Sequence, residues 1–227
     1  MPAPQKIIEN LWIVGDASLS NPKDACAYLL NGKESAVLID TGAGENPQAI
    51  ELNIESTGIA ISRVKHIVLT HCHIDHVGGV EHLRKVTKAS VVCHQLCAES
   101  LERGDMERTA ASWYGIKLSP INIDLKFSGN KYIIDLGNLE LKLIHTPGHS
   151  PGSISAYCDI DNIRVLFGQD IHGPFSPVLG SNIAEWRNSM QKLIALDADI
   201  LCEGHYGVIK GKNKVKEFIR SFLEEYS

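Results

Sequence analysis

The chain has 227 residues, of which 44% are hydrophobic and 22% charged, and its formal net charge is −5. These fractions are typical of a globular protein with a substantial core and exclude a disordered or fibrous chain. The acidic balance and the lack of a basic run argue against nucleic acid as a partner. No apolar run approaches the length of a membrane span, so no membrane partner is expected.

The chain start and the cysteine content point to a cytoplasmic protein. The first residues, MPAPQKIIEN, lack a charged segment followed by a long apolar stretch, so no secretory signal is predicted. Six cysteines are too few for a disulfide scaffold, and we expect reduced thiols. No linker, repeat or low-complexity tract divides the sequence, which predicts a single domain over residues 1–227.

Short apolar runs bounded by turn residues predict strands interleaved with helices. The predicted strands are Leu11–Val14, Ala27–Leu30, Ala36–Ile39, Ile67–Leu69, Ser90–Val92, Tyr132–Ile134, Leu139–Ile144, Ser153–Cys158, Ile163–Phe167 and Asp199–Cys202. Helices are predicted after the N-cap Asn46, after Asn182 with Glu185 in a capping box, and over Asn213–Glu224. This alternation favours an α/β architecture in which helices cover sheets.

Four of the predicted strands lead directly into a segment that carries His or Asp. These segments are THCHIDH at 70–76, HTPGH at 145–149, GQD at 168–170 and EGH at 203–205. Loops that a rigid sheet holds in place commonly carry metal and catalytic groups. We therefore expect the four strand ends to converge on one site.

The segment at 71–76 is the strongest indication of a metal site. His71, His73, Asp75 and His76 lie within six residues, and imidazole and carboxylate are good ligands for first-row divalent metals. Because side chains alternate in an extended segment, His71 and His73 point the same way and can bind one ion. Asp75 and His76 turn differently, which suits a second ion.

Three further residues are interpreted as ligands because they occur as a set after this cluster. Taken singly, His149 could be a turn residue, Asp170 could cap the next segment and His205 could be a surface residue. Each of them follows a separate apolar strand, however, and together they complete a metal site of the kind that the first cluster predicts.

In this order the motifs resemble those of the metallo-β-lactamase superfamily. They are Asp40-Thr41-Gly42, THCHIDHVGG at 70–79, HTPGHSPG at 145–152, FGQD at 167–170 and EGHYG at 203–207. The resemblance implies an αββα four-layer sandwich with the metal site at one edge between the two sheets. It also implies two divalent metal ions, with zinc favoured and iron or manganese open. The first ion would be bound by His71, His73 and His149, the second by Asp75, His76 and His205, and Asp170 would bridge them.

The TPGHxxG and GD elements are most similar to those of the hydroxyacylglutathione hydrolase (glyoxalase II) group. We therefore expect a hydrolase of thioesters or of small esters such as lactones, in which Asp75 accepts a proton from a metal-bound water and the resulting hydroxide attacks. A thiolate leaves without protonation whereas an amide nitrogen requires an acid, for which His172 is the one candidate. Two alternatives remain open: an iron-dependent oxidoreductase resembling persulfide dioxygenases, and a metal-bearing ligand-binding or sensor module.

Several other positions have expected roles. Asp40 is expected to hydrogen-bond a ligand histidine and so fix its ring. Cys72 is out of phase with the histidines and is expected to pack behind the site, and Cys93 and Cys97 form only a weak candidate for a soft metal pair. Tyr206 is a candidate substrate contact.

The segment 102–127, with Trp113 and Tyr114, is interpreted as a lid or an interface element. The expected partner is a small molecule that carries an anionic group or a carbonyl, because two divalent ions leave the site positively charged within an acidic protein. Association into a homodimer is a further possibility that the sequence leaves open.

Overall fold

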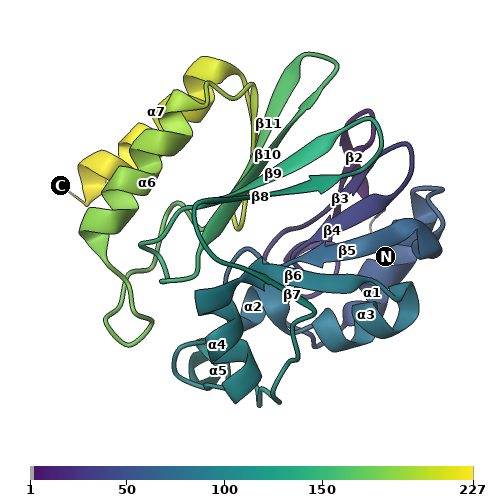
Figure 1. Cartoon of the computed structure of the whole chain (residues 1–227), viewed down its shortest axis with the longest axis horizontal. Coiled ribbons are helices and arrows are strands. Elements are labelled where there is room, and N and C mark those ends of the chain that lie inside the picture. Colours follow the sequence, from purple (N-terminus) through teal and green to yellow (C-terminus); the bar gives the residue numbers. More distant parts are fainter. Residues whose placement is uncertain (1–2, 227) are drawn as a thin grey trace.

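Two β-sheets pack face to face in the middle of the molecule, and helices cover their outer faces (Figure 1). The structure is a computed structural model that describes residues 3–226. The predicted αββα sandwich is thus confirmed, with one sheet from the first half of the chain and the other from the second half. No helix in this range is long and apolar enough to span a membrane.

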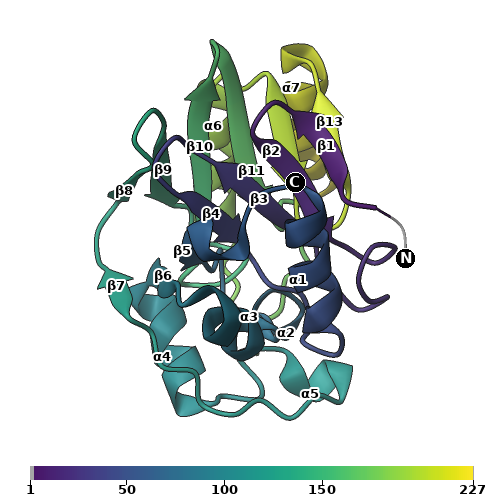
Figure 2. The ribbon, with the colours of Figure 1, turned by 90° about the vertical axis from the view of Figure 1, so that its right-hand side faces the viewer.

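The first sheet has seven strands, hydrogen-bonded in sequence order. They are β1 (Gln5–Ile8), β2 (Leu11–Gly15), β3 (Ala27–Asn31), β4 (Ala36–Ile39), β5 (Val64–Val68), β6 (Ser90–His94) and β7 (Leu125–Phe127). The strands β1 to β4 are antiparallel, and β4 to β7 are parallel. Five helices and a 3₁₀ turn belong to this half: α1 (Pro47–Ser56), η1 (Ile61–Arg63), α2 (Ile74–Val77), α3 (Val80–Thr87), α4 (Gln95–Arg103) and α5 (Ala111–Tyr114). Figure 2 shows α1 to α5 gathered on the same side of the molecule.

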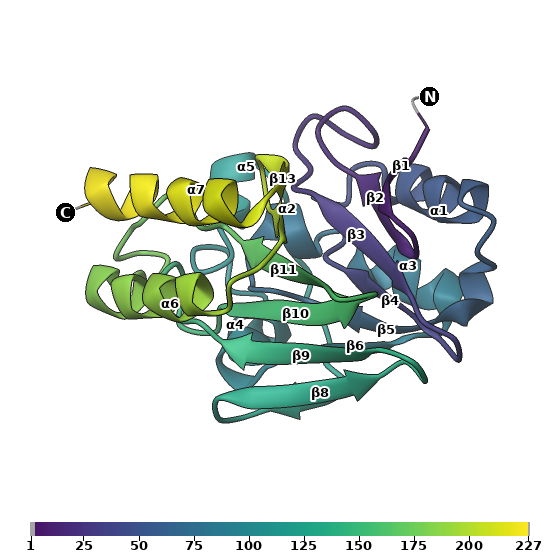
Figure 3. The same ribbon diagram turned by 90° about the horizontal axis from the view of Figure 1, so that it is seen from above.

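The second sheet has six strands in the order β13-β12-β11-β10-β9-β8. Their bounds are β8 (Lys131–Asp135), β9 (Glu140–His145), β10 (Ile154–Ile160), β11 (Ile163–Gln169), β12 (Ile200–Glu203) and β13 (Gly207–Lys210). Only β11 and β12 are parallel, because α6 (Ile183–Ala195) lies between them in the chain. That helix and α7 (Lys212–Glu225) run side by side over the outer face of this sheet (Figure 3).

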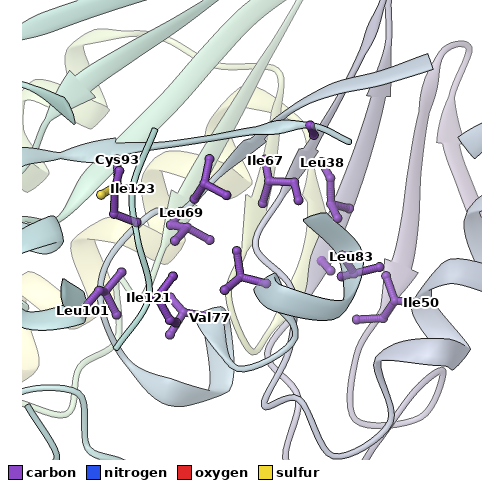
Figure 4. Packing of buried hydrophobic residues seen from close by; sticks show 14 of the residues in the cluster. Leu38, Ile50, Ile67, Leu69, Val77, Leu83, Cys93, Leu101, Ile121 and Ile123 are labelled. Atoms are coloured by element: carbon purple, nitrogen blue, oxygen red, sulfur yellow. The ribbon is translucent and has the colours of Figure 1, made fainter. Parts of the chain in front are cut away.

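Three apolar layers hold the four structural layers together. They lie between the first sheet and its helices, between the two sheets, and between the second sheet and α6 and α7. Because successive side chains of a strand point to opposite faces, one strand supplies two layers: Leu38 faces the helices, whereas Val37 and Ile39 face the second sheet. In Figure 4, Leu38 and Ile67 of the first sheet approach Leu83 of α3. Each fully buried side chain of this size contributes about 2 kcal/mol to folding.

The helix caps confirm one prediction and refine another. The side chain of Asn182 accepts a hydrogen bond from the backbone N–H of Glu185, as the capping box requires. Asn46 does precede α1, but its side chain makes no cap hydrogen bond and instead donates to the carbonyl of Ser20 at 3.0 Å. Proline at the first helical position still favours the start of α1 there.

Candidate metal centre

The strand ends converge at one edge of the sandwich, as the sequence predicts. Asp40 follows β4, and His71 and His73 come shortly after β5. The second sheet contributes one residue from each of three loops, which follow β9, β11 and β12. The seven side chains predicted as ligands lie in two adjacent clusters, one of His71, His73, His149 and Asp170 and one of Asp75, His76 and His205. Asp170 and His205 also form a third group with His172.

The separations between donor atoms suit metal ligands. His149 Nε2 lies 3.4 Å from Asp170 Oδ2, and His205 Nε2 lies 3.3 Å from Asp75 Oδ2. Two ligand atoms bound at about 2.1 Å to one tetrahedral ion are about 3.4 Å apart. Asp170 also lies 3.1 Å from His76 Nε2 and 3.5 Å from His205 Nε2, so it stands between the clusters. The donors and their spacing therefore fit divalent cations.

Several buried ring nitrogens at the centre make no hydrogen bond within the described residues. His76 Nδ1 hydrogen-bonds Asp40 Oδ2 at 2.7 Å, the contact predicted for Asp40, and His71 Nδ1 lies 3.1 Å from Thr70 Oγ1. The Nε2 atoms of His71, His73 and His76 are buried and make no hydrogen bond within residues 3–226. Such unpartnered polar atoms are costly. A cation would satisfy those of His71 and His76, whereas His73 presents its other nitrogen, Nδ1, to His149 Nε2 at 3.0 Å.

The surroundings of the histidines give them opposite pKa shifts. Burial and the neighbouring His149 lower the pKa of His73 to about 3, which keeps that ring in the neutral form that binds metals. Burial also opposes protonation of His205, but hydrogen bonds with Asp170 and Asp75 outweigh it and raise the pKa of His205 to about 10. The carboxylates therefore favour positive charge at the centre.

Unusual backbone conformations place the carboxylates. Asp40 has a φ of 61°, and Gln169, directly before Asp170, has a φ of 53°. Residues with a Cβ seldom adopt this region, and such strain persists where the surrounding structure fixes it. Gly78 serves a different need: a Cβ there would lie 2.0 Å from the carbonyl oxygen of Ala43. Only glycine lets the end of α2 approach the loop after β4 so closely.

A cavity of about 200 Å³ opens beside the centre, and we call it the metal-site cavity. Asp75 and His205 line it together with Trp113 and Tyr114 from α5, so the segment 102–127 reaches the site. The hydroxyl of Tyr114 donates a hydrogen bond to Asp75 Oδ2 at 2.9 Å, and Trp113 is 52% exposed. One carboxylate oxygen of Asp75 is thereby held in place from the cavity wall.

Glu203 is a site residue that the sequence analysis missed. It is fully buried; its Oε1 accepts from the backbone N–H of Ile171 at 3.0 Å and lies 2.9 Å from His172 Nδ1. Its Oε2 accepts from the backbone N–H groups of His205 and Tyr206 at 2.7 and 2.9 Å. The carboxylate thus joins the loop after β11 to the loop after β12. A charged residue that ends an otherwise apolar strand is the signal that could have identified it.

The remaining predicted positions lie around the centre. Cys72 is buried, donates to the carbonyl of Arg108 at 3.4 Å and packs behind the site, as predicted. Cys93 and Cys97 are buried in the apolar core, and no metal-ligating cluster within residues 3–226 includes either of them. Tyr206 is 57% exposed and packs on the phenylalanines of α7; it does not line the metal-site cavity.

Comparison with known proteins identifies relatives of the whole fold. A family model described as "Metallo-beta-lactamase superfamily" matches residues 20–205. An uncharacterized protein of Aquifex aeolicus is 30% identical over 189 residues, which cover 80% of this chain and 83% of that protein. A human protein named acyl-coenzyme A thioesterase MBLAC2 is 29% identical over 63% of this chain and 57% of its own length.

A solved structure has the same architecture. The metallo-β-lactamase of Cronobacter sakazakii, in a mutant of its HARLDQ motif, superimposes with a TM-score of 0.84 at 21% identity. The match covers 100% of this chain and 96% of that one. At this identity the likeness establishes the fold.

Proposed function

Because this chain belongs to the metallo-β-lactamase superfamily, we propose that it is a metal-dependent hydrolase of thioesters or of small esters such as lactones. The observation that carries the proposal is the meeting of imidazoles and carboxylates at the wall of a cavity that a small molecule can enter. Two further points support thioesters: the resemblance of the motifs to the glyoxalase II group, and the name of the human relative, an acyl-coenzyme A thioesterase.

We assign the ligands as the two clusters suggest. His71, His73 and His149 would hold one divalent ion and Asp75, His76 and His205 a second, with Asp170 shared between them. Zinc is favoured, because four-coordinate sites of imidazole and carboxylate suit it. When bound, such ions supply a nucleophile at neutral pH and polarise the scissile carbonyl.

The protein's own contribution centres on Asp75. Its carboxylate is buried at the cavity wall and hydrogen-bonded to Tyr114, so its position is fixed before the substrate arrives. We assign Asp75 to orient the attacking water and to accept its proton. A group held in place in this way needs no reorganisation during the reaction.

The leaving group of the substrate favours thioesters over amides. A thiol has a pKa of about 8.5 and departs as a thiolate, whereas an amide nitrogen must be protonated in order to leave. His172 lines the metal-site cavity, and its Nδ1 lies 2.9 Å from the carboxylate of Glu203. This contact fixes the ring at the cavity wall, and thioester hydrolysis does not require an acid there.

A substrate panel tests the proposal. Protein loaded with Zn²⁺, Fe²⁺ or Mn²⁺ is assayed with glutathione thioesters, acyl-CoA thioesters and lactones, and metal content is measured on the same samples. We expect hydrolysis of at least one thioester, and a loss of about 10²–10⁴-fold in kcat in D75N. The control is H82Q, since His82 pairs with Glu51 outside the centre and its loss should leave turnover unchanged.

The outcomes separate this function from the open alternatives. Metal-loaded protein that hydrolyses none of these substrates would overturn the proposal. Oxygen uptake with glutathione persulfide by protein with a single iron would instead support the oxidoreductase. Tight binding of a thioester without turnover would support a sensor module.

A further inference from the structure

A second cavity, of about 400 Å³, lies next to the metal-site cavity, and we call it the outer cavity. Its wall combines residues from α4, from the loop that follows it and from the segments at 151–152 and 179. Leu179 lines both cavities. No residue that we assign as a metal ligand lines the outer cavity, so it is a separate compartment beside the centre.

The chain between the two cavities is tied directly to the metal centre. The carbonyl of Arg108 accepts from the thiol of Cys72 at 3.4 Å, and the carbonyl of Thr109 accepts from the backbone N–H of Ile74 at 2.8 Å. Both donors are direct neighbours of His73. The next residue, Ala110, already lines the metal-site cavity. This short stretch and Leu179 therefore separate the two cavities.

The charged side chains around the outer cavity have ion-pair or hydrogen-bond partners within the described residues, with one exception. Arg103 pairs with Glu99 at 3.8 Å, and Asp105 Oδ1 accepts from the backbone N–H groups of Glu107 and Arg108 at 3.1 and 2.9 Å. The guanidinium of Arg108 is half-buried, and among residues 3–226 it has neither an ion-pair nor a hydrogen-bond partner. Arginine stays charged at any physiological pH and has five donors to satisfy.

The backbone leaves room for this guanidinium. A Cβ on Gly180 would lie 2.0 Å from Arg108 Nη1, so the guanidinium rests directly on the glycine. Any side chain at position 180 would push it away. Arg108 is thus accommodated at the cavity wall without a partner, and a carboxylate or phosphate group can engage its planar donors in a bidentate way.

We propose that the outer cavity binds an anionic group of the substrate, a carboxylate or a phosphate, through Arg108, while the scissile bond lies in the metal-site cavity. This inference rests on the proposed function. It narrows the substrate class to thioesters or esters that carry a negative charge at a distance from the reacting carbonyl. Neutral substrates of the same length would lack this contact.

The test compares charged with neutral substrates. The substrates are thioesters with a terminal carboxylate or phosphate, placed on the acyl side or on the thiol side at increasing distance from the thioester bond. Each is compared with a neutral thioester in which a terminal amide replaces the anionic group. For the best anionic compound we expect R108A to lower kcat/KM by about 10–100-fold, the factor that a hydrogen bond to a charged group carries. For the neutral thioester, kcat/KM should change less than about twofold in R108A. R108K should recover part of the loss of kcat/KM for the anionic substrate. R103A is the matched control, because Arg103 lines the same cavity but is exposed and already paired.

A binding experiment separates this inference from the proposed function. Non-hydrolysable thioether analogues of all the anionic compounds are titrated calorimetrically into wild-type protein, R108A and R103A, and the analogue that wild type binds most tightly is compared. Wild type and R103A should bind alike, and R108A should bind at least tenfold more weakly, even in a protein that turned over none of the thioesters. Equal binding by all three proteins, or an equal loss of kcat/KM for anionic and amide substrates in R108A, would overturn the inference.

Discussion

The carboxylate of Asp40 holds the imidazole of His76 by a hydrogen bond of 2.7 Å to Nδ1, while His76 Nε2 faces the metal centre. The same carboxylate accepts from the backbone N–H and the hydroxyl of Thr70, at 2.8 and 2.7 Å. Asp40 therefore fixes both the ring and the start of the loop that carries His71. It does so from the end of β4, where its own backbone is in the left-handed region.

Replacement of this carboxylate should weaken metal binding. An asparagine in D40N keeps one acceptor but presents an N–H₂ where His76 and Thr70 both donate. Loss of such a partner behind a metal ligand typically costs 10–100-fold in affinity, and we expect a change of this size in D40N, measured by competition with a chromophoric chelator. The control is D159N, because Asp159 forms a surface ion pair with Arg164. Unchanged affinity in D40N would contradict the role assigned to Asp40.

The hydrogen bond from Tyr114 to Asp75 should affect turnover more than substrate binding. In Y114F the ring remains in the metal-site cavity while the 2.9 Å contact is lost. We expect kcat for a small thioester to fall about tenfold with KM nearly unchanged, the size of effect of one hydrogen bond to a charged group. Steady-state kinetics with metal content verified would measure it. A rise in KM alone would show instead that Tyr114 only contacts the substrate.

Glu203 should be important for stability. Its carboxylate has four contacts at the site, and a glutamine would leave two of the facing donors without an acceptor. We expect E203Q to lower the free energy of unfolding by about 3 kcal/mol, determined from urea denaturation of the metal-loaded protein. The exposed Glu140 supplies the control E140Q, for which no loss beyond about 0.5 kcal/mol is expected. Equal stability of the two variants would contradict the assignment.

The two clusters should titrate metal separately. His205 is the most exposed of the predicted ligands, so H205A should fold normally while losing a ligand of the cluster with Asp75 and His76. We expect about two ions per chain in the wild type and about one in H205A, measured by elemental analysis after dialysis. Removal of all metal should lower the Tm of the wild type as well, since an ion at 1,000 times its Kd stabilises the folded protein by about 4 kcal/mol. Identical stoichiometry in both proteins would disprove separate sites.

Much of the architecture could be predicted because its signals are local. The strand Ala36–Ile39 is observed with the predicted bounds, and the other predicted strands differ from the observed ones by a few residues at their ends. Three strands were missed: β1, β7 and β13. The last two are short, with sequences LKF and GVIK, and become strands because a neighbouring strand offers backbone partners.

The site, too, has features with a local sequence signal and features that depend on distant parts of the chain. The gathering of the predicted ligands follows from motifs placed at strand ends, which the sequence displays. Two features could not be predicted in this way: the hydrogen bond between Tyr114 and Asp75, and the set of four contacts of Glu203. They depend on the path of loops between distant parts of the chain, and no short motif encodes that path.

Each half of the chain supplies only part of the proposed metal centre. His71, His73, Asp75 and His76 come from the half that builds the first sheet, whereas His149, Asp170 and His205 come from the half that builds the second. With the proposed ligands, full-affinity capture of a cation during refolding must therefore wait until both halves have docked. A metal-sensitive dye would then time the closing of the sandwich, whereas far-ultraviolet circular dichroism would follow the formation of its separate strands and helices.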